Sequence, residues 1–148
     1  MRLLNYIHNN LNLVHNLRGS TMNTQLSILI VDDVGTVRSF LNQTLMHLGI
    51  EKVKEASTAA QCISACQAAD YNIIFLDIEL PDGDGKEIIA QINEINPETN
   101  VVMVSAHSTV ENVKDAIEKG AKGFVVKPFT PKKIAAMLKK FYPDLEVV

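Results

Sequence analysis

Short, continuous apolar runs alternate with amphipathic segments along the chain from residue 26 onward. Four of the runs are rich in Val, Ile and Phe and show no polar alternation, which is typical of strands covered on both faces. These four runs lie at residues 26–31, 72–76, 100–104 and 122–126. A fifth run, at residues 51–56, is more polar and indicates a strand at the edge of a sheet.

Each run is followed by a segment whose apolar residues have helical spacing. The markers are Val34, Val37, Leu41, Leu45 and Leu48; Ile63; Ile88, Ile92 and Ile95; Val110, Val113 and Ile117; and Ile134, Met137, Leu138 and Phe141. We expect the first helix to stop at Gly49 and the fourth at Gly120. Ser57 is expected to open the second helix. Thr130 as N-cap, with Pro131 at the first helical position, predicts the start of the fifth.

Five strands that alternate with five helices predict an α/β fold. The expected architecture is a doubly wound five-stranded parallel sheet with five flanking helices, joined by right-handed crossovers. This pattern fills residues 26–142, which leaves residues 1–25 as an N-terminal extension and residues 143–148 as a C-terminal tail.

The first 21 residues have a different composition. They are rich in Asn, with apolar residues spaced loosely at Leu4, Ile7, Leu11 and Val14. They could form a short amphipathic helix that docks or self-associates, a floppy extension, or a segment upstream of a true start at Met22. We expect the extension to be dispensable.

Composition and charge exclude several classes of protein. The chain of 148 residues is 47% hydrophobic and 21% charged, which fits one folded, soluble domain. A net charge of -3 gives no general basic field for nucleic acid. No apolar run approaches the roughly 20 residues that span a bilayer, and the N-terminus lacks a signal peptide's apolar core. We therefore expect a cytoplasmic protein. Cys62 and Cys66 are interpreted as small buried thiols without a function.

Polar residues follow four of the five apolar runs at the point where each run ends. Asp32 and Asp33 follow the first run, Asp77 the third, Ser105 the fourth and Lys127 the fifth. Because all strands of a doubly wound sheet run the same way, these residues gather at the carboxyl edge, where such folds bind ligands. Each alone could be a loop acid, a helix cap or a solvated lysine. Four at the same topological position indicate a site.

Three carboxylates in one place repel one another by about 4 kcal/mol per close pair at an effective dielectric near 20. They persist through protonation or by binding a cation. Oxygen ligands with too few carboxylates for a full cage suit Mg²⁺. A lysine supplies a point charge for phosphate oxygens, and a hydroxyl supplies one further donor. Together these groups indicate phosphoryl transfer to an aspartate.

Four motifs, in this order, resemble those of response-regulator receiver domains of the CheY-like kind: VDDVGTVR, FLDIELPDGDG, MVSAH and VVKPF. The resemblance covers about residues 26–142 and implies the flavodoxin-like strand order 2-1-3-4-5. It also implies a stand-alone two-component response regulator. Such a protein accepts phosphate from a histidine kinase or phosphotransfer protein, promotes its own phosphorylation and dephosphorylation, and is not a turnover enzyme.

The resemblance also implies roles for the acidic residues. Asp77 would be the phosphoacceptor. Asp33 would bind Mg²⁺ together with Asp77 and the backbone carbonyl of Glu79, while Asp32 would act mostly through water. Glu79 is also expected, with His107, to tune how long the phosphate lasts.

Ser105 and Lys127 would bind the phosphoryl oxygens, and the Lys127–Pro128 peptide is expected to be cis. Phe124 occupies the aromatic switch position of the family. When Ser105 moves toward the phosphoryl group, the Phe124 ring is expected to turn inward. That motion would reshape a face made by the fourth helix, the fifth strand and the fifth helix, which would then bind a target protein.

Four other residues near these motifs are given structural roles. We expect Gly85 to let the loop close tightly onto the next helix. Thr36 is expected to cap the first helix in preference to touching the site. Asp82 and Asp84 are expected to be exposed acids that start the helix after them.

Alternatives remain open within and beyond this family. A phosphate sink or relay intermediate rivals an effector that binds a target. An aspartyl-phosphate hydrolase of the haloacid dehalogenase type would carry a second Asp two positions after Asp33, where the chain has Gly35. A flavin binder would need a Ser/Thr/Gly-rich phosphate loop after the first strand. Direct nucleic-acid binding and membrane insertion are not expected, and the protein is either a monomer or a phosphorylation-dependent dimer.

Overall fold

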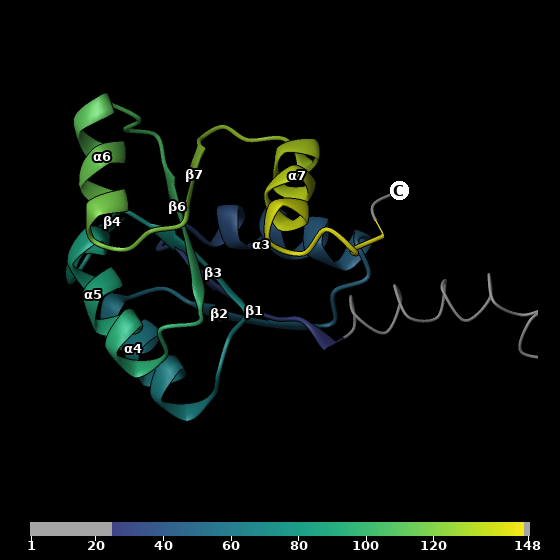
Figure 1. The fold of residues 1–148 in the computed structure, drawn as a ribbon, viewed down its shortest axis with the longest axis horizontal. Helices are drawn as coiled ribbons and strands as arrows, with labels where there is room; N and C mark the ends of the chain where they lie inside the picture. The colour runs from purple at the N-terminus through teal and green to yellow at the C-terminus, as the bar shows by residue number, and fades with distance from the viewer. Residues whose placement is uncertain (1–24, 147–148) are drawn as a thin grey trace, which may run out of the picture.

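The computed structural model describes residues 25–146, and these residues form a parallel sheet between two layers of helices (Figure 1). The sheet has the strand order β2-β1-β3-β6-β7. Its strands are β1 (Ser27–Val31), β2 (Lys52–Ala56), β3 (Ile73–Asp77), β6 (Asn100–Ser105) and β7 (Gly123–Val126). The order and direction of the strands confirm the predicted doubly wound fold, with the polar strand β2 at one edge.

The helices lie on both faces of the sheet, as predicted. They are α3 (Gly35–His47), α4 (Ala59–Ala68), α5 (Gly85–Ile95), α6 (Val110–Glu118) and α7 (Pro131–Phe141). Helices α3 and α7 cover one face, and α4, α5 and α6 cover the other (Figure 1). Among the described residues, no helix is both long and apolar enough to cross a membrane.

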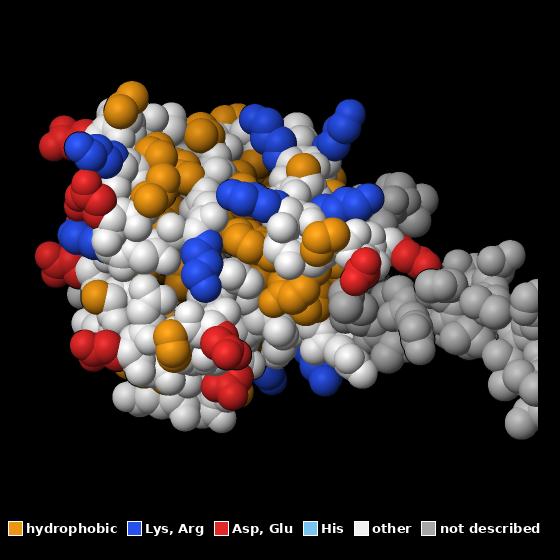
Figure 2. Space-filling view, viewed as in Figure 1, with side chains coloured by type: hydrophobic (Ala, Val, Ile, Leu, Met, Phe, Trp, Pro, Cys, Tyr) orange, Lys and Arg blue, Asp and Glu red, His pale blue; other side chains and the backbone are white. Residues whose placement is uncertain are grey.

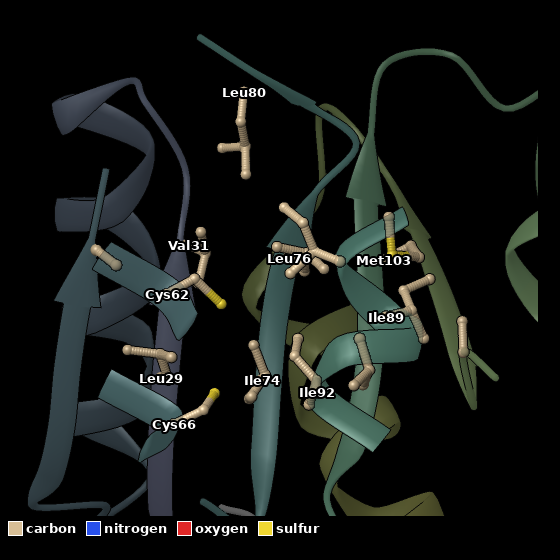
Figure 3. Packing of buried hydrophobic residues seen from close by; sticks show 14 of the residues in the cluster. Leu29, Val31, Cys62, Cys66, Ile74, Leu76, Leu80, Ile89, Ile92 and Met103 are labelled. Carbon is tan, nitrogen blue, oxygen red and sulfur yellow. The ribbon is translucent and has the colours of Figure 1, made fainter. Parts of the chain in front are cut away.

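The central strands are buried on both sides, which explains their unbroken apolar runs. In β1, Leu29 and Val31 pack beneath α4 and α5, while Ile28 and Ile30 pack beneath α3 and α7. Figure 3 shows the α4 side of this core, with side chains of α4 and α5 directed toward β1, β3 and β6. Burial of these residues supplies the main stabilising term of the fold, about 1.5–3 kcal/mol for each large side chain.

Cys62 and Cys66 both point from α4 into this core (Figure 3) and are free thiols. Their side chains fill space between α4 and the sheet. The prediction of small buried cysteines is therefore confirmed.

Two helix starts differ from the prediction by their capping residue. Helix α4 begins after Thr58, whose hydroxyl accepts a hydrogen bond from the backbone N–H of Gln61. Ser57, the predicted opener, instead contacts the side chain of Gln61. Helix α3 follows Val34 without a side-chain cap, so the expected capping role of Thr36 is wrong.

The other predicted helix ends are confirmed. Thr130 accepts a hydrogen bond from Lys133 at the start of α7, with Pro131 at the first helical position. Gly49 and Gly120 follow α3 and α6 with positive φ angles of 82° and 111°, a conformation that favours glycine. The interpretation of residues 1–21 concerns residues outside those described.

One predicted apolar stripe is exposed. Val110 and Ile117 of α6 are 86% and 57% exposed, and Ala116 is the buried residue of this helix. Helix α6 therefore lies where the spacing of apolar residues predicted a helix, but much of its apolar face contacts solvent.

A short hairpin between β3 and α5 was not predicted. It pairs β4 (Glu79–Leu80) with β5 (Gly83–Asp84) in antiparallel fashion. This hairpin lies within the acidic motif and places Glu79 above the carboxyl edge of the sheet.

Candidate functional site

The predicted polar residues do meet at the carboxyl edge of the sheet, because the strand register brings them level. Val31 of β1 pairs with Leu76 of β3. The next residue of each segment, Asp32 and Asp77, therefore lies beside the other at the carboxyl end of the sheet. On the other side of β3, β6 ends at Ser105, which pairs with Val126 of β7. Lys127 then begins the loop that follows β7.

Asp32, Asp33 and Asp77 form one cluster, in which each offers an oxygen within 4.8 Å of the others. Asp32 and Asp77 are buried, and Asp33 is exposed. Backbone groups orient the two buried carboxylates. The N–H of Val34 donates to Asp32 Oδ1 (2.9 Å), and the N–H of Glu79 donates to Asp77 Oδ1 (3.3 Å).

Lys127 lies between the two buried acids. Its Nζ is 2.7 Å from Asp32 Oδ2 and 3.5 Å from Asp77 Oδ2. Burial alone would lower the pKa of Lys127, but its hydrogen bond to Asp32 and the charge of Asp77 outweigh burial, so the pKa is raised. The lysine is therefore held in its charged form, and its peptide bond to Pro128 is cis, as predicted.

The pKa of Asp77 is raised above its ordinary value. Burial is the largest cause and the nearby charge of Asp32 adds to it, while Lys127 acts in the opposite direction. The cluster contains three carboxylates and Lys127 contacts two of them, so a net negative charge remains. An exclusively oxygen donor set with residual negative charge fits a hard divalent cation such as Mg²⁺, and the cluster could hold one.

Ser105 is buried at the end of β6, and its Oγ accepts a hydrogen bond from the backbone N–H of His107 (2.9 Å). Phe124 pairs with Met103 within the sheet and is half-buried against the core on the α6 side. The roles of Ser105 and Phe124 in switching remain predictions.

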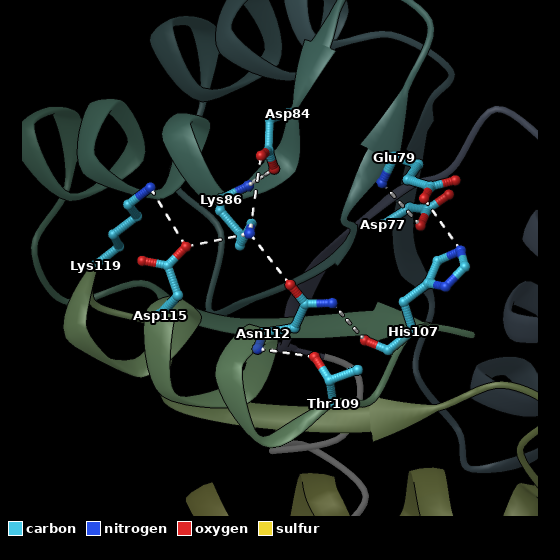
Figure 4. Close-up of polar contacts among 9 residues, drawn as sticks. All are labelled: Asp77, Glu79, Asp84, Lys86, His107, Thr109, Asn112, Asp115 and Lys119. Carbon is cyan, nitrogen blue, oxygen red and sulfur yellow. Dashed lines mark hydrogen bonds and ion pairs between the residues drawn. The ribbon is translucent and has the colours of Figure 1, made fainter.

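Glu79 and His107 contact each other above this edge of the sheet (Figure 4). The Nε2 atom of His107 is 3.1 Å from Glu79 Oε1, although the two side chains are 60% and 73% exposed. Sequence reasoning gave both residues a role in phosphate lifetime but did not predict that they touch. Their contact joins the β3–α5 loop to the β6–α6 loop.

Gly85 confirms the predicted close approach behind the site. A Cβ atom there would collide with the backbone carbonyl oxygen of Asp77. The Gly85 N–H also donates to the Ile78 carbonyl (2.6 Å). A side chain at this position would displace the backbone that carries Asp77.

Of the two acids in the hairpin, one has the expected role and the other does not. Asp84 caps α5 by accepting from the Lys86 N–H, as predicted. Asp82 does not start the following helix, because its carboxylate binds the N–H groups of Ala59 and Ala60 at the start of α4 (2.7 and 3.0 Å). These bonds lower the pKa of Asp82.

One neighbour of the site, Arg38, was not identified from the sequence, and Thr36 was given a capping role in preference to one at the site. Arg38 of α3 donates from Nη1 to the Asp32 backbone carbonyl (2.6 Å) and fixes the start of the acidic loop. Its place in the VDDVGTVR motif was the available signal. Thr36 lines an apolar hollow of about 480 Å³ beside Lys127, together with Phe40.

Comparisons with known proteins agree with this geometry. Residues 28–139 match the family described as the response regulator receiver domain. The chain is 36% identical over 115 residues to the chemotaxis protein CheY of Listeria monocytogenes, covering 78% of this chain and 97% of that protein. It is 34% identical over 113 residues to CheY of Bacillus subtilis, covering 76% and 94% of the two chains.

Solved structures show the same fold. A CheY-like receiver domain protein from Methanospirillum hungatei superposes with a TM-score of 0.75 at 28% identity, covering 81% of this chain and 97% of that one. A CheX-CheY-BeF3-Mg+2 complex from Borrelia burgdorferi gives a TM-score of 0.75 at 28% identity, with 79% and 89% coverage. The chain therefore belongs to the response-regulator receiver family of CheY-like proteins.

Proposed function

We propose that this protein is a two-component response regulator whose Asp77 accepts a phosphoryl group from a histidine kinase or phosphotransfer protein. The cluster of Asp32, Asp33 and Asp77, with Lys127 in contact with Asp32 and Asp77, carries the proposal. In the transfer, an Asp77 oxygen forms a bond to phosphorus as the bond between phosphorus and the donor nitrogen breaks. The donor histidine leaves with the electron pair of that bond.

Asp33, Asp77 and the backbone carbonyl of Glu79 would hold Mg²⁺, which neutralises charge on the phosphoryl oxygens when bound. Asp32 is already committed to Lys127 and to the Val34 N–H. This commitment supports the prediction that Asp32 reaches a metal mostly through water.

Lys127 would move from neutralising carboxylates to binding the phosphoryl group. Its contact with Asp77 is the longer of its two, so the attacking oxygen is only loosely held. After transfer, Asp77 has become an acyl phosphate with new anionic oxygens within reach of the Lys127 ammonium. Ser105 would donate its hydroxyl hydrogen to another of these oxygens.

The modified protein would act through the face formed by α6, β7 and α7. Val110, Ile117 and Val126 are exposed apolar side chains on these elements. Lys133 and Lys140 flank an apolar hollow of about 350 Å³ on the same face. Figure 2 shows basic side chains beside apolar ones on the α7 side of the molecule. This exposed apolar area favours an effector that binds a protein over a phosphate sink.

Phosphotransfer from purified histidine kinases in Mg²⁺ tests the acceptor. We expect the wild type to take up label and Asp77→Asn to take up none. Asp70→Asn, a change of the same charge at an exposed position after α4, is the matched control and keeps full labelling. Equal labelling of wild type and Asp77→Asn would refute the assignment.

The target face is tested with beryllofluoride-treated wild type and Ile117→Asp as baits. Both should bind beryllofluoride alike, because Ile117 is exposed and lies on α6, apart from the acid cluster. We expect a target that is retained by the activated wild type, but not by Ile117→Asp. Retention of the same proteins with and without beryllofluoride would favour the sink or relay.

A further inference from the structure

The loop between β6 and α6 is tied to α5 by a line of side-chain contacts (Figure 4). Asn112, in the first turn of α6, donates from Nδ2 to the backbone carbonyl of His107 (3.2 Å). The Oδ1 atom of Asn112 accepts from Nζ of Lys86 (3.3 Å), which lies in the first turn of α5. One amide group therefore bridges the loop and a neighbouring helix.

Lys86 is well fixed at the α5 end of this line. Its side chain is only 15% exposed, and its Nζ lies 3.1 Å from Asp115 and 4.0 Å from Asp84. An ammonium group can only donate, so the oxygen of the Asn112 amide faces Lys86 and the NH₂ group faces the loop. Lys86 thus sets the orientation in which Asn112 can hold the His107 carbonyl.

Asn112 and Ser105 contact the two adjacent peptide groups that flank the Cα atom of His107. The backbone N–H of His107 donates to Ser105 Oγ (2.9 Å), while the carbonyl of His107 is bound by Asn112. Residues 106–110 are exposed, so little core packing fixes this loop. To reach a phosphoryl group on Asp77, the Ser105 hydroxyl must either break its hydrogen bond with the His107 N–H or move together with that N–H.

We propose that Asn112, oriented by Lys86, is a positioning residue that holds the β6–α6 loop in its unmodified arrangement and opposes engagement of Ser105 with the phosphoryl group. This inference rests on the proposed function of Asp77. The restraint acts on the His107 backbone, so it is separate from the contact of the His107 ring with Glu79. It biases a two-state loop toward the unmodified state.

The substitution Asn112→Asp keeps the contact of residue 112 with Lys86 and removes its contact with the His107 carbonyl. The substituted carboxylate still accepts from Lys86, but it presents an oxygen where the wild type presents a donor to the His107 carbonyl. Loss of one net hydrogen bond from the unmodified state should lower the half-saturating beryllofluoride concentration about fivefold in Mg²⁺. The chain has no tryptophan, so fluorine NMR of bound beryllofluoride is the readout.

Three further measurements complete the test. Lys86→Met should also tighten beryllofluoride binding, since the amide loses its orienting partner. Lys119→Met is the matched control, because it removes another partner of Asp115 (3.7 Å) outside this line, and its binding should be unchanged. Amide hydrogen exchange of residues 105–110 should be faster in Asn112→Asp than in the wild type, with unchanged exchange in the sheet.

The outcomes separate this inference from the proposed function. If the wild type binds beryllofluoride and Asn112→Asp binds it equally or more weakly, Asn112 does not restrain the loop. If the wild type does not bind beryllofluoride, or if Asp77→Asn binds it equally well, both the proposed function of Asp77 and the proposed restraint by Asn112 are refuted.

Discussion

Replacing Asp77 with Asn should stabilise the metal-free protein. Carboxylate oxygens of Asp77, Asp32 and Asp33 lie within 4.8 Å of one another, and Lys127 is shared between Asp77 and Asp32. At an effective dielectric near 20, each like-charge pair at about 5 Å costs about 3 kcal/mol. Attraction to Lys127 at 3.5 Å offsets about 5 kcal/mol on the same scale. The repulsion of the two pairs exceeds this attraction by about 1 kcal/mol.

Thermal and urea unfolding in EDTA at pH 7 measure this difference. A gain of about 1 kcal/mol corresponds to a rise of about 4 °C in Tm for a domain of this size. The amide oxygen of the variant can still accept from the Glu79 N–H, so the loop keeps its hydrogen bond. Asp70→Asn controls for the change in net charge and should leave Tm nearly unchanged.

Mg²⁺ and pH should both remove the advantage of Asp77→Asn. At about ten times its Kd, Mg²⁺ stabilises the wild type by about 1.4 kcal/mol and reverses the order of the two proteins. The pKa of Asp77 is raised in the folded state, so its unfavourable charge is fully present at neutral pH. As the pH falls through that raised pKa toward about 4, the folded protein takes up the proton and the difference disappears. Equal stability of the two proteins in EDTA, with no selective effect of Mg²⁺, would refute the reasoning.

Three further changes test separate parts of the site. Gly85→Ala should lower the free energy of unfolding by about 2 kcal/mol in urea, because its Cβ collides with the Asp77 carbonyl; an unchanged midpoint would contradict this close approach. Lys127→Met should slow labelling of Asp77 by acetyl phosphate about 100-fold, with the fold checked by circular dichroism; wild-type rates would exclude Lys127 from the chemistry. Glu79→Asn and His107→Ala should change the rate of dephosphorylation by similar factors that do not multiply in the double variant, because the two side chains touch; multiplicative effects would show independent roles.

The sheet and the place of the site were predictable because both follow from local patterns and one topological rule. Adjacent residues of β1, such as Leu29 and Ile30, face opposite layers, so a covered strand must be apolar throughout. The rule that parallel strands end at one edge then brought Asp77 and Ser105 together without any knowledge of side-chain contacts.

Pairings between distant segments were not predictable in this way. Asp82 binds the start of α4, more than twenty positions before it, because the β4–β5 hairpin folds back toward that helix. The contact between Glu79 and His107 likewise depends on how two loops bend. A sequence pattern gives the spacing along one element, but not the reach of a side chain between elements. The cap of α4 moved by one residue because Ser57 and Thr58 are both good capping residues.

The hydrogen-bond partners of the acids support assigning the reaction to Asp77. Asp32 has its two carboxylate oxygens committed to short contacts of 2.9 and 2.7 Å, and Asp33 is exposed. Asp77 alone is buried yet held by contacts of 3.3 and 3.5 Å. Its raised pKa makes the carboxylate more basic, and therefore a better nucleophile, than a solvated aspartate. These contacts satisfy Asp32 and leave Asp77 desolvated and weakly bound, which supports the proposal that Asp77 accepts the phosphoryl group.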